Sequence, residues 1–350
     1  MLACRLGPFA GAQPISIMVF SNFVMQALQN QTVGQEYAVA ALTRGVTLAF
    51  AGLRGRGGVL GVMFFIGPAS SGKTHMARML ARVLTGNEQT MLYVNCQQLE
   101  QATDHLASLE GQLTSTYRET PAQGTGSAPA FQVVVLEEID KAPPAFRDDL
   151  ALAIDCGEIS TPNRVFPLRN SFVILISDLS RKKADQLVGR TIGFFLDGEP
   201  AVEMSRRQAV ALEEVDNRVG PRLVSRIDEV VVFDRLNQQN IITLLERKLA
   251  DIERYLGASC IGFIIEQEAK TFLLKEGLED LNHGARQITR VVRNYLEFPL
   301  ADLMLSRRLV PGTTVSVSHE QPRSFLNFEI MIPGIAPVEL HDTKARAMPA

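Results

Sequence analysis

The chain has 350 residues, 46% of them hydrophobic and 21% charged, which is typical of a folded globular protein and excludes a disordered or collagen-like chain. At about 150 residues per domain, this length predicts two domains. The 35 lysine and arginine residues face 38 acidic residues, and the resulting net charge of −3 disfavours a nucleic-acid-binding protein.

The cysteines and histidines show no metal-ligand spacing. Cys4, Cys96, Cys156 and Cys260 form no CxxC pair, which favours free thiols in a reducing compartment over a disulfide framework. No apolar run reaches about 18 residues, so we expect no transmembrane helix and no membrane partner. The interpretation is a cytoplasmic protein.

Five continuous apolar runs indicate buried strands. Runs of this kind, without strict alternation, are typical of parallel strands that are covered on both faces. Helix-compatible stretches lie between them, so the sequence predicts an α/β fold with a doubly wound, parallel five-stranded sheet. The runs are Val62–Ile66, Met91–Val94, Phe131–Leu136, Phe172–Ile176 and Val230–Phe233.

Two segments between these runs carry weaker patterns. Glu119–Ala130 is rich in Gly, Pro, Ser and Thr and predicts a surface loop, whereas Arg181–Arg218 is expected to be irregular with short helices. After about Arg235, apolar residues keep helical spacing, and the runs Thr313–Val317 and Phe325–Ile330 predict strands. The expected organisation is a lead-in at 1–30, an α/β domain at 31–235, a smaller, mainly helical domain with a few short strands at 236–333, and a tail without clear pattern at 334–350.

A glycine-rich loop directly follows the first apolar run. Residues 67–74 (GPASSGKT) fit the pattern GxxxxGK[ST], with a strand before the loop and a helix-compatible stretch after it. Gly67 and Gly72 allow successive N–H groups to form an anion nest, to which the helix adds its positive end. Lys73 would bind the β- and γ-phosphates of a nucleotide, and Thr74 would offer its hydroxyl to Mg²⁺. A plain strand-to-helix turn is the weaker alternative.

Two carboxylates, Glu137 and Glu138, end the third apolar run. Ligands of parallel sheets collect at the carboxyl ends of the strands. If this strand neighbours the strand before the phosphate loop, one carboxylate would hold the metal, mostly through water, and the second would orient or deprotonate the attacking water. A solvated strand end is the alternative, and the phosphate loop upstream favours the catalytic interpretation.

With these motifs the chain resembles the AAA+ ATPases, most closely the second AAA+ module of the ClpA/ClpB unfoldases with its small C-terminal domain. The resemblance covers about residues 32–330. It rests on six segments in the family's order: 32–39 (TVGQEYAV) beside the adenine, 67–74 as Walker A, 133–142 (VVVLEEIDKA) as Walker B, 172–180 (FVILISDLS) as the sensor 1 strand, 221–233 (PRLVSRIDEVVVF) as the arginine-finger segment, and 284–286 (GAR) at the start of the sensor 2 helix.

The resemblance implies four catalytic residues. Glu138 would orient the attacking water, and Asp178 occupies the sensor 1 position. Arg226 would be the arginine finger that reaches the γ-phosphate of a neighbouring subunit, and Arg286 would be sensor 2, touching the nucleotide of its own subunit. An ordinary ion pair with Asp228 is the alternative for Arg226.

The resemblance also implies the ligands. Arg286, Arg290 and Arg293 share one face of a helix, and a solvated basic face is the interpretation for the latter two. The expected cofactors are ATP and Mg²⁺, with Thr74 and Glu137 as metal ligands. ATP would be contacted by Val33, Gly34, Gly67, Pro68, Ala69, Ser70, Ser71, Gly72, Lys73, Thr74 and His75.

Three positions differ from the family pattern. Glu137 replaces the usual Asp, and the extra methylene moves the carboxylate by about 1.5 Å, which matters for octahedral Mg²⁺. Asp178 replaces the usual Asn, and an ionised carboxylate cannot donate a hydrogen bond and repels phosphate. The segment Val94–Thr116 contains no aromatic residue, although unfoldases of this type carry a Gly-Tyr-Val-Gly pore loop there, and Asp155–Arg169 keeps only the outline of a second pore loop.

The retained residues favour a ring-forming AAA+ ATPase, by resemblance a homo-hexamer, that remodels, unfolds or disassembles a protein substrate or adaptor. The three departures support an alternative, an ATP-dependent assembly scaffold or regulator with impaired hydrolysis and no polypeptide threading. A nucleic-acid motor or loader is disfavoured by the net charge of −3. The identity of the partner and the ring size stay open at this point.

Overall fold

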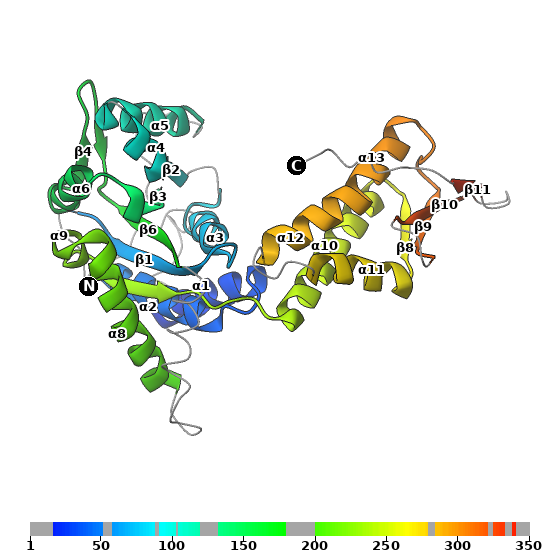
Figure 1. Cartoon of the computed structure of the whole chain (residues 1–350), viewed down its shortest axis with the longest axis horizontal. Coiled ribbons are helices and arrows are strands. Elements are labelled where there is room, and N and C mark those ends of the chain that lie inside the picture. Colours follow the sequence, from blue (N-terminus) through cyan, green and yellow to red (C-terminus); the bar gives the residue numbers. More distant parts are fainter. Residues whose placement is uncertain are drawn as a thin grey trace. The chain divides into compact units, whose positions relative to one another are not determined.

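The computed structural model describes residues 17–51, 58–87, 91–102, 104–119, 132–179, 200–278, 284–320, 325–332 and 338–340. The chain divides into two compact units, residues 1–235 and 236–350 (Figure 1). The first unit contains α1 (Ile17–Gln31), α2 (Glu36–Phe50), β1 (Gly61–Pro68), α3 (Lys73–Thr85), β2 (Met91–Asn95), α4 (Cys96–Gln101), α5 (His105–Glu119), β3 (Gln132–Glu137), a 3₁₀ turn (Ile139–Lys141), α6 (Pro144–Cys156), β4 (Glu158–Ser160), β5 (Val165–Pro167), β6 (Ser171–Leu179), α8 (Pro200–Val219), α9 (Pro221–Val224) and β7 (Glu229–Val232).

The central sheet of the first unit has five parallel strands in the order β2-β3-β6-β1-β7. The predicted fold class and all five predicted strands are therefore confirmed, with bounds that differ by up to three residues. The condition under which Glu137 and Glu138 were placed at the metal, that β3 neighbours β1, is not met, because β6 lies between the two strands. In this order Gly67 of β1 pairs in register with Asp178 of β6.

The sheet has a hydrophobic core on each face, which explains why its strands are apolar throughout rather than alternating. Alternate residues of β1 serve the two cores: Phe64 and Ile66 pack with α4, α5, α6 and α8, whereas Met63 and Phe65 pack with α1, α2 and α3. The four side chains are at most 1% exposed. Because both faces are covered, the carboxyl edge of the sheet is left for a ligand.

Two expectations for this unit need correction. Residues 17–31 of the expected lead-in form helix α1, which buries Phe20, Val24 and Leu28 against α2 and α3. From residue 200 on, the segment that was expected to be irregular with short helices is one long helix, α8, over residues 200–219. Residues 180–199, and the predicted surface loop apart from Glu119, lie outside the described residues.

The second unit combines helices with a small sheet around one core. Three strands run antiparallel, and β8 joins β9 in parallel, giving the order β11-β10-β9-β8. Its elements are α10 (Gln238–Ala258), β8 (Gly262–Ile265), α11 (Gln267–Leu278), α12 (Gly284–Val292), a π-helical turn (Arg293–Glu297), α13 (Phe298–Leu305), β9 (Thr314–Ser318), β10 (Asn327–Met331) and β11 (Val338–Leu340).

Part of the predicted tail forms a strand. Residues 338–340 form β11, which pairs with β10, so the small domain reaches beyond the expected boundary at 333. Cys96, Cys156 and Cys260 are free thiols, as predicted, whereas Cys4 lies outside the described residues. None of the helices in the described part of the chain has the length and apolar character that a membrane span requires.

Candidate functional site: the carboxyl edge of the sheet

The loop after β1 curls back on itself before helix α3 begins. Ser70 and Gly72 have positive φ angles of 61° and 100°, and the glycine is suited to this conformation because it has no Cβ. Gly67 packs so closely against the end of β7 that an added Cβ would lie 2.5 Å from the carbonyl oxygen of Phe233. The two glycines of the motif are therefore required for different reasons, one for φ and one for space.

Lys73 is the first residue of α3, and its side chain is only 4% exposed. Its Nζ donates to the carbonyl oxygens of Gly67 at 3.0 Å and Pro68 at 2.6 Å. It also forms an ion pair with Asp178 Oδ1 at 2.7 Å. The ammonium is thus folded back against its own loop and against the neighbouring strand β6.

The hydroxyl of Thr74 on α3 and the carboxylate of Glu137 at the end of β3 meet, although β6 lies between β3 and β1, the strand that leads into the phosphate loop. Thr74 Oγ1 donates to Glu137 Oε1 at 2.6 Å. The other oxygen, Oε2, accepts a hydrogen bond from the phenol of Tyr93 on β2. Burial, followed by this hydrogen bond, raises the pKa of Tyr93 well above its usual range, so the phenol remains a donor at neutral pH. Tyr93 was not predicted from the sequence.

Glu138 leaves the strand in a left-handed conformation, with φ of 57°. Its Oε1 accepts from Lys141 Nζ at 2.7 Å, and this hydrogen bond raises the pKa of Lys141. The turn re-aims Glu138 relative to the pleat of β3. The two adjacent carboxylates at the end of β3 therefore have different partners. Glu137 is bonded to Thr74 and Tyr93, and Glu138 to Lys141.

Arg218 of α8 is a second residue that sequence reasoning missed. Its Nη1 donates to Ser177 Oγ at 3.1 Å and to the carbonyl oxygen of Asp178 at 2.8 Å. The same side chain pairs with Asp140 at 3.4 Å and with Glu214 at 2.8 Å. Arg218 thereby ties the end of β6 to the 3₁₀ turn behind β3.

Arg226 follows α9 and does not form the ion pair with Asp228 that was the alternative to a finger role. It pairs with Asp155 of α6, with Nη2 at 2.6 Å from Oδ2, and this contact raises the pKa of Arg226. Asp228 instead accepts a hydrogen bond from the backbone N–H of Val62 at 2.9 Å. The Arg226–Asp155 pair remains partly exposed, with 23% and 37% of the two side chains accessible.

The segment before α2 reaches the phosphate loop through Gln35, which is 3% exposed. Its Nε2 donates to the carbonyl oxygens of Ser71 at 3.1 Å and Asp234 at 2.8 Å, and its Oε1 accepts from the N–H of Asp234 at 2.9 Å. Val33 and Gly34 are therefore held next to the loop by the residue that follows them. His75 is exposed, and its Nε2 lies 3.2 Å from the carbonyl oxygen of Gln31.

Arg286 belongs to the second unit, where it is exposed on α12 together with Arg290, and exposed Arg293 follows at the start of the π-helical turn. The opposite face of the helix carries Ile288 and Val291, which are buried in the core of this unit. The predicted amphipathic pattern is present.

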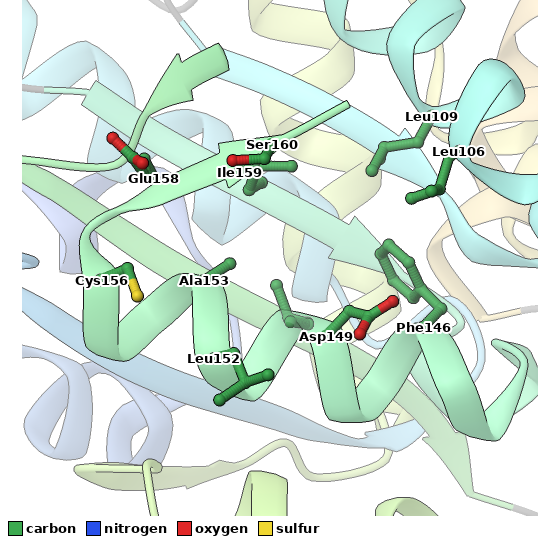
Figure 2. Close-up of a pocket in the computed structure, with 11 residues that line it drawn as sticks. Leu106, Leu109, Phe146, Asp149, Leu152, Ala153, Cys156, Glu158, Ile159 and Ser160 are labelled. Atoms are coloured by element: carbon green, nitrogen blue, oxygen red, sulfur yellow. The ribbon is translucent and has the colours of Figure 1, made fainter. Parts of the chain in front are cut away.

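The region between β2 and β3 contains no aromatic pore loop within the described residues, and β2 leads directly into α4 and then α5. The second expected pore segment forms the β4–β5 hairpin. A pocket of about 270 Å³ lies between α5, α6 and β4, lined by apolar side chains such as Leu109 and Phe146 and by Asp149 and Glu158 (Figure 2). None of the phosphate-loop residues lines it.

Comparison with known proteins places both units in families. Residues 59–230 match the model of the AAA domain (Cdc48 subfamily), and residues 236–317 match that of the C-terminal, D2-small domain of ClpB protein. The chaperone protein ClpD, chloroplastic, of Arabidopsis thaliana is 30% identical over 303 residues, covering 83% of this chain and 31% of that protein. The ATP-binding subunit ClpC of the ATP-dependent Clp protease of Staphylococcus aureus (strain USA300) is 26% identical over 305 residues, covering 84% and 36%.

A solved structure shares the fold. The S. cerevisiae Hsp104–ADP complex matches with a TM-score of 0.67 at 23% identity, covering 91% of this chain and 55% of that one. The chain spans about a third of the length of the curated relatives it matches. With both units matched in order, the chain belongs to the AAA+ ATPases, as an AAA domain followed by a small domain of the ClpB D2 type.

Proposed function

We propose that the chain is a ring-forming ATPase that binds and hydrolyses ATP with Mg²⁺ to remodel, unfold or disassemble a protein partner. The observation that carries the proposal is the meeting of Lys73, Thr74 and Glu137 at one edge of the sheet, behind a loop with the backbone of an anion nest. Membership of the AAA+ family supports it. The location in the cytoplasm stays a prediction.

The residues at this edge fit a nucleotide and its metal. Loop N–H groups and Lys73 would bind the phosphates. The Thr74 hydroxyl and the Glu137 carboxylate are hard oxygen donors, and Mg²⁺ in proteins is usually held by one or two such groups together with phosphates and water. When bound, the ion would neutralise charge on the β- and γ-phosphates.

Glu138 is the residue proposed to act on the attacking water. Lys141 donates a hydrogen bond to Oε1 of Glu138. No described residue donates to Oε2, which is therefore available to accept a hydrogen bond from water. The ion pair fixes the side chain, and a fixed acceptor orients its water more effectively than a mobile one. Arg286 is proposed to contact the nucleotide from the second unit.

Arg226 is proposed to act across a subunit boundary, in a ring that the family resemblance suggests is a homo-hexamer. The exposed pair with Asp155 would be exchanged for a pair with the neighbour's γ-phosphate. An exposed ion pair contributes only about 0.2–1 kcal/mol to stability, so breaking the pair with Asp155 costs little free energy. A finger of this kind is worth about 10³–10⁵ in rate.

The test is Mg²⁺-dependent ATP turnover with oligomer size measured on the same samples. We expect turnover to be lost in Lys73→Ala and reduced by about 10³ or more in Arg226→Ala. Arg222→Ala is the matched control, because Arg222 lies four residues before Arg226, on α9, but its side chain is 72% exposed and pairs with Asp148. Mixing the Lys73→Ala and Arg226→Ala proteins should restore part of the turnover. In a mixed ring, the intact Lys73 of one variant and the intact Arg226 of the other can form a complete site at their shared boundary.

The outcomes separate the proposal from its alternatives. Unchanged turnover in an assembled Arg226→Ala sample would exclude the trans-acting finger. If Asp155→Asn lowers turnover as much as Arg226→Ala, the ion pair has a structural role instead. Tight ATP binding and assembly with negligible wild-type turnover would identify the chain as a nucleotide-dependent scaffold.

A further inference from the structure

The carboxylate of Asp178 is paired with the lysine of the phosphate loop. β6 is the direct neighbour of β1, and Asp178 pairs in register with Gly67, the first residue of the phosphate loop. Its Oδ1 lies 2.7 Å from Lys73 Nζ. The Lys73 side chain is 4% exposed and the Asp178 side chain 48%, so the pair sits at the solvent-facing mouth of the loop.

The ion pair leaves the lysine without a spare donor. An ammonium group has three protons to donate, and Lys73 Nζ already contacts the carbonyl oxygens of Gly67 and Pro68, the hydroxyl of Ser71 at 3.5 Å and the Asp178 carboxylate. A phosphate that binds Lys73 must therefore displace Asp178 or lie beside it. In the second case two negative groups lie within about 4 Å of each other, and like charges at that separation disfavour binding.

The Asp178 main chain cannot move aside easily. It pairs in register with Gly67 of β1, and the same strand is paired with β3 up to Ile176, two residues earlier. Arg218 Nη1 also donates to the carbonyl oxygen of Asp178 at 2.8 Å. Only rotation of the side chain toward solvent remains, and this rotation breaks the ion pair with Lys73.

We propose that Asp178 is an internal competitor for Lys73 that sets nucleotide preference. Each phosphate group placed near Lys73 meets the Asp178 carboxylate, and the γ-phosphate of a triphosphate adds charge that a diphosphate lacks. The chain therefore discriminates against ATP relative to ADP more strongly than the same site with a neutral residue at position 178. The inference rests on the proposed nucleotide site and adds a specificity-determining residue to it.

The experiment measures equilibrium binding of ATP and of ADP, each with Mg²⁺, by competition with a fluorescent ATP analogue. We expect Asp178→Asn to tighten ATP binding about tenfold and ADP binding less, so that the ratio of the two dissociation constants shifts toward ATP. Asp178→Ala should shift the ratio in the same direction, because it removes the charge without adding an amide donor.

Asp148→Asn is the control for a change of net charge. Asp148 lies on α6 and pairs with exposed Arg222, and we expect its substitution to leave both dissociation constants unchanged. Thermal unfolding of each variant checks that it is folded.

Each outcome decides the matter. Unchanged or weaker ATP binding in folded Asp178→Asn overturns the proposal, as does tightening by Asn but not Ala, which would assign the effect to amide donation. Equal tightening of ATP and ADP also overturns the preference for diphosphate. The proposed function fails separately, if Lys73→Ala binds ATP as well as the wild type does.

Discussion

Replacing Tyr93 with Phe tests how the site positions Glu137, where the family resemblance led us to expect an aspartate. The change removes one hydroxyl and leaves the ring in place. In the native site Glu137 is held from two sides, by Thr74 on Oε1 and by Tyr93 on Oε2. Without the phenol, Oε2 loses its donor and the carboxylate can rotate away from Thr74.

The magnitude follows from the type of hydrogen bond. A hydrogen bond to a charged group contributes about 1.5–3 kcal/mol, and the partial exposure of both residues places this one at the lower end. About 1.4 kcal/mol corresponds to a tenfold change. We therefore expect Tyr93→Phe to lower Mg²⁺-dependent ATP turnover about tenfold and to raise the Mg²⁺ concentration for half-maximal turnover.

A double-mutant cycle with Glu137→Asp isolates this interaction. The aspartate side chain is about 1.5 Å shorter than that of glutamate, so its carboxylate can reach Thr74 or Tyr93 but not both. In the Glu137→Asp background, Tyr93→Phe should therefore change turnover less than about twofold, and the two substitutions should be strongly non-additive. Equal effects of Tyr93→Phe in both backgrounds would refute the view that the phenol acts through Glu137.

Three further substitutions or reactions test the geometry. Gly67→Ala should destabilise the protein by about 1–3 kcal/mol in denaturant unfolding, because its Cβ would overlap Phe233, and should abolish nucleotide binding; wild-type stability would contradict the close packing. Arg218→Ala should lower the unfolding free energy by about 1–3 kcal/mol, because its hydrogen bonds to the end of β6 are lost, and Arg218→Lys should recover only part of it. In thiol alkylation followed by peptide mapping, exposed Cys156 should react in the native protein and Cys96 only after unfolding, since burial raises the pKa of Cys96; equal rates would show that α4 opens readily.

The sheet could be predicted from the sequence because its strands are buried on both faces and therefore apolar throughout. Helix α8 could not, because its expected region was judged by weak local patterns, whereas Ala211 and Val215 are buried by tertiary packing. Strand β11 was not predicted for a related reason. A strand of three residues is stabilised by pairing with β10 and not by its own composition.

The candidate site divides in the same way. The phosphate loop and the carboxylates after β3 are contiguous in sequence, so spacing alone could indicate them. Tyr93 reaches the site because β2 lies beside β3, and Arg218 reaches it from the long helix α8. No local sequence pattern indicates either residue. The partner of Arg226 was likewise decided by the packing of α9 on α6, which a neighbouring aspartate in the sequence could not reveal.

Gln35 gives the phosphate loop a mechanical connection to the rest of the chain. The same side-chain amide binds Ser71 in the loop and Asp234, two residues before the second unit begins. Any change in loop geometry therefore alters the restraint on the segment that leaves β7. The reverse also holds, because linkage between two sites is reciprocal. Force or binding on the second unit that disturbs Asp234 would thus change the affinity of the loop for its ligand.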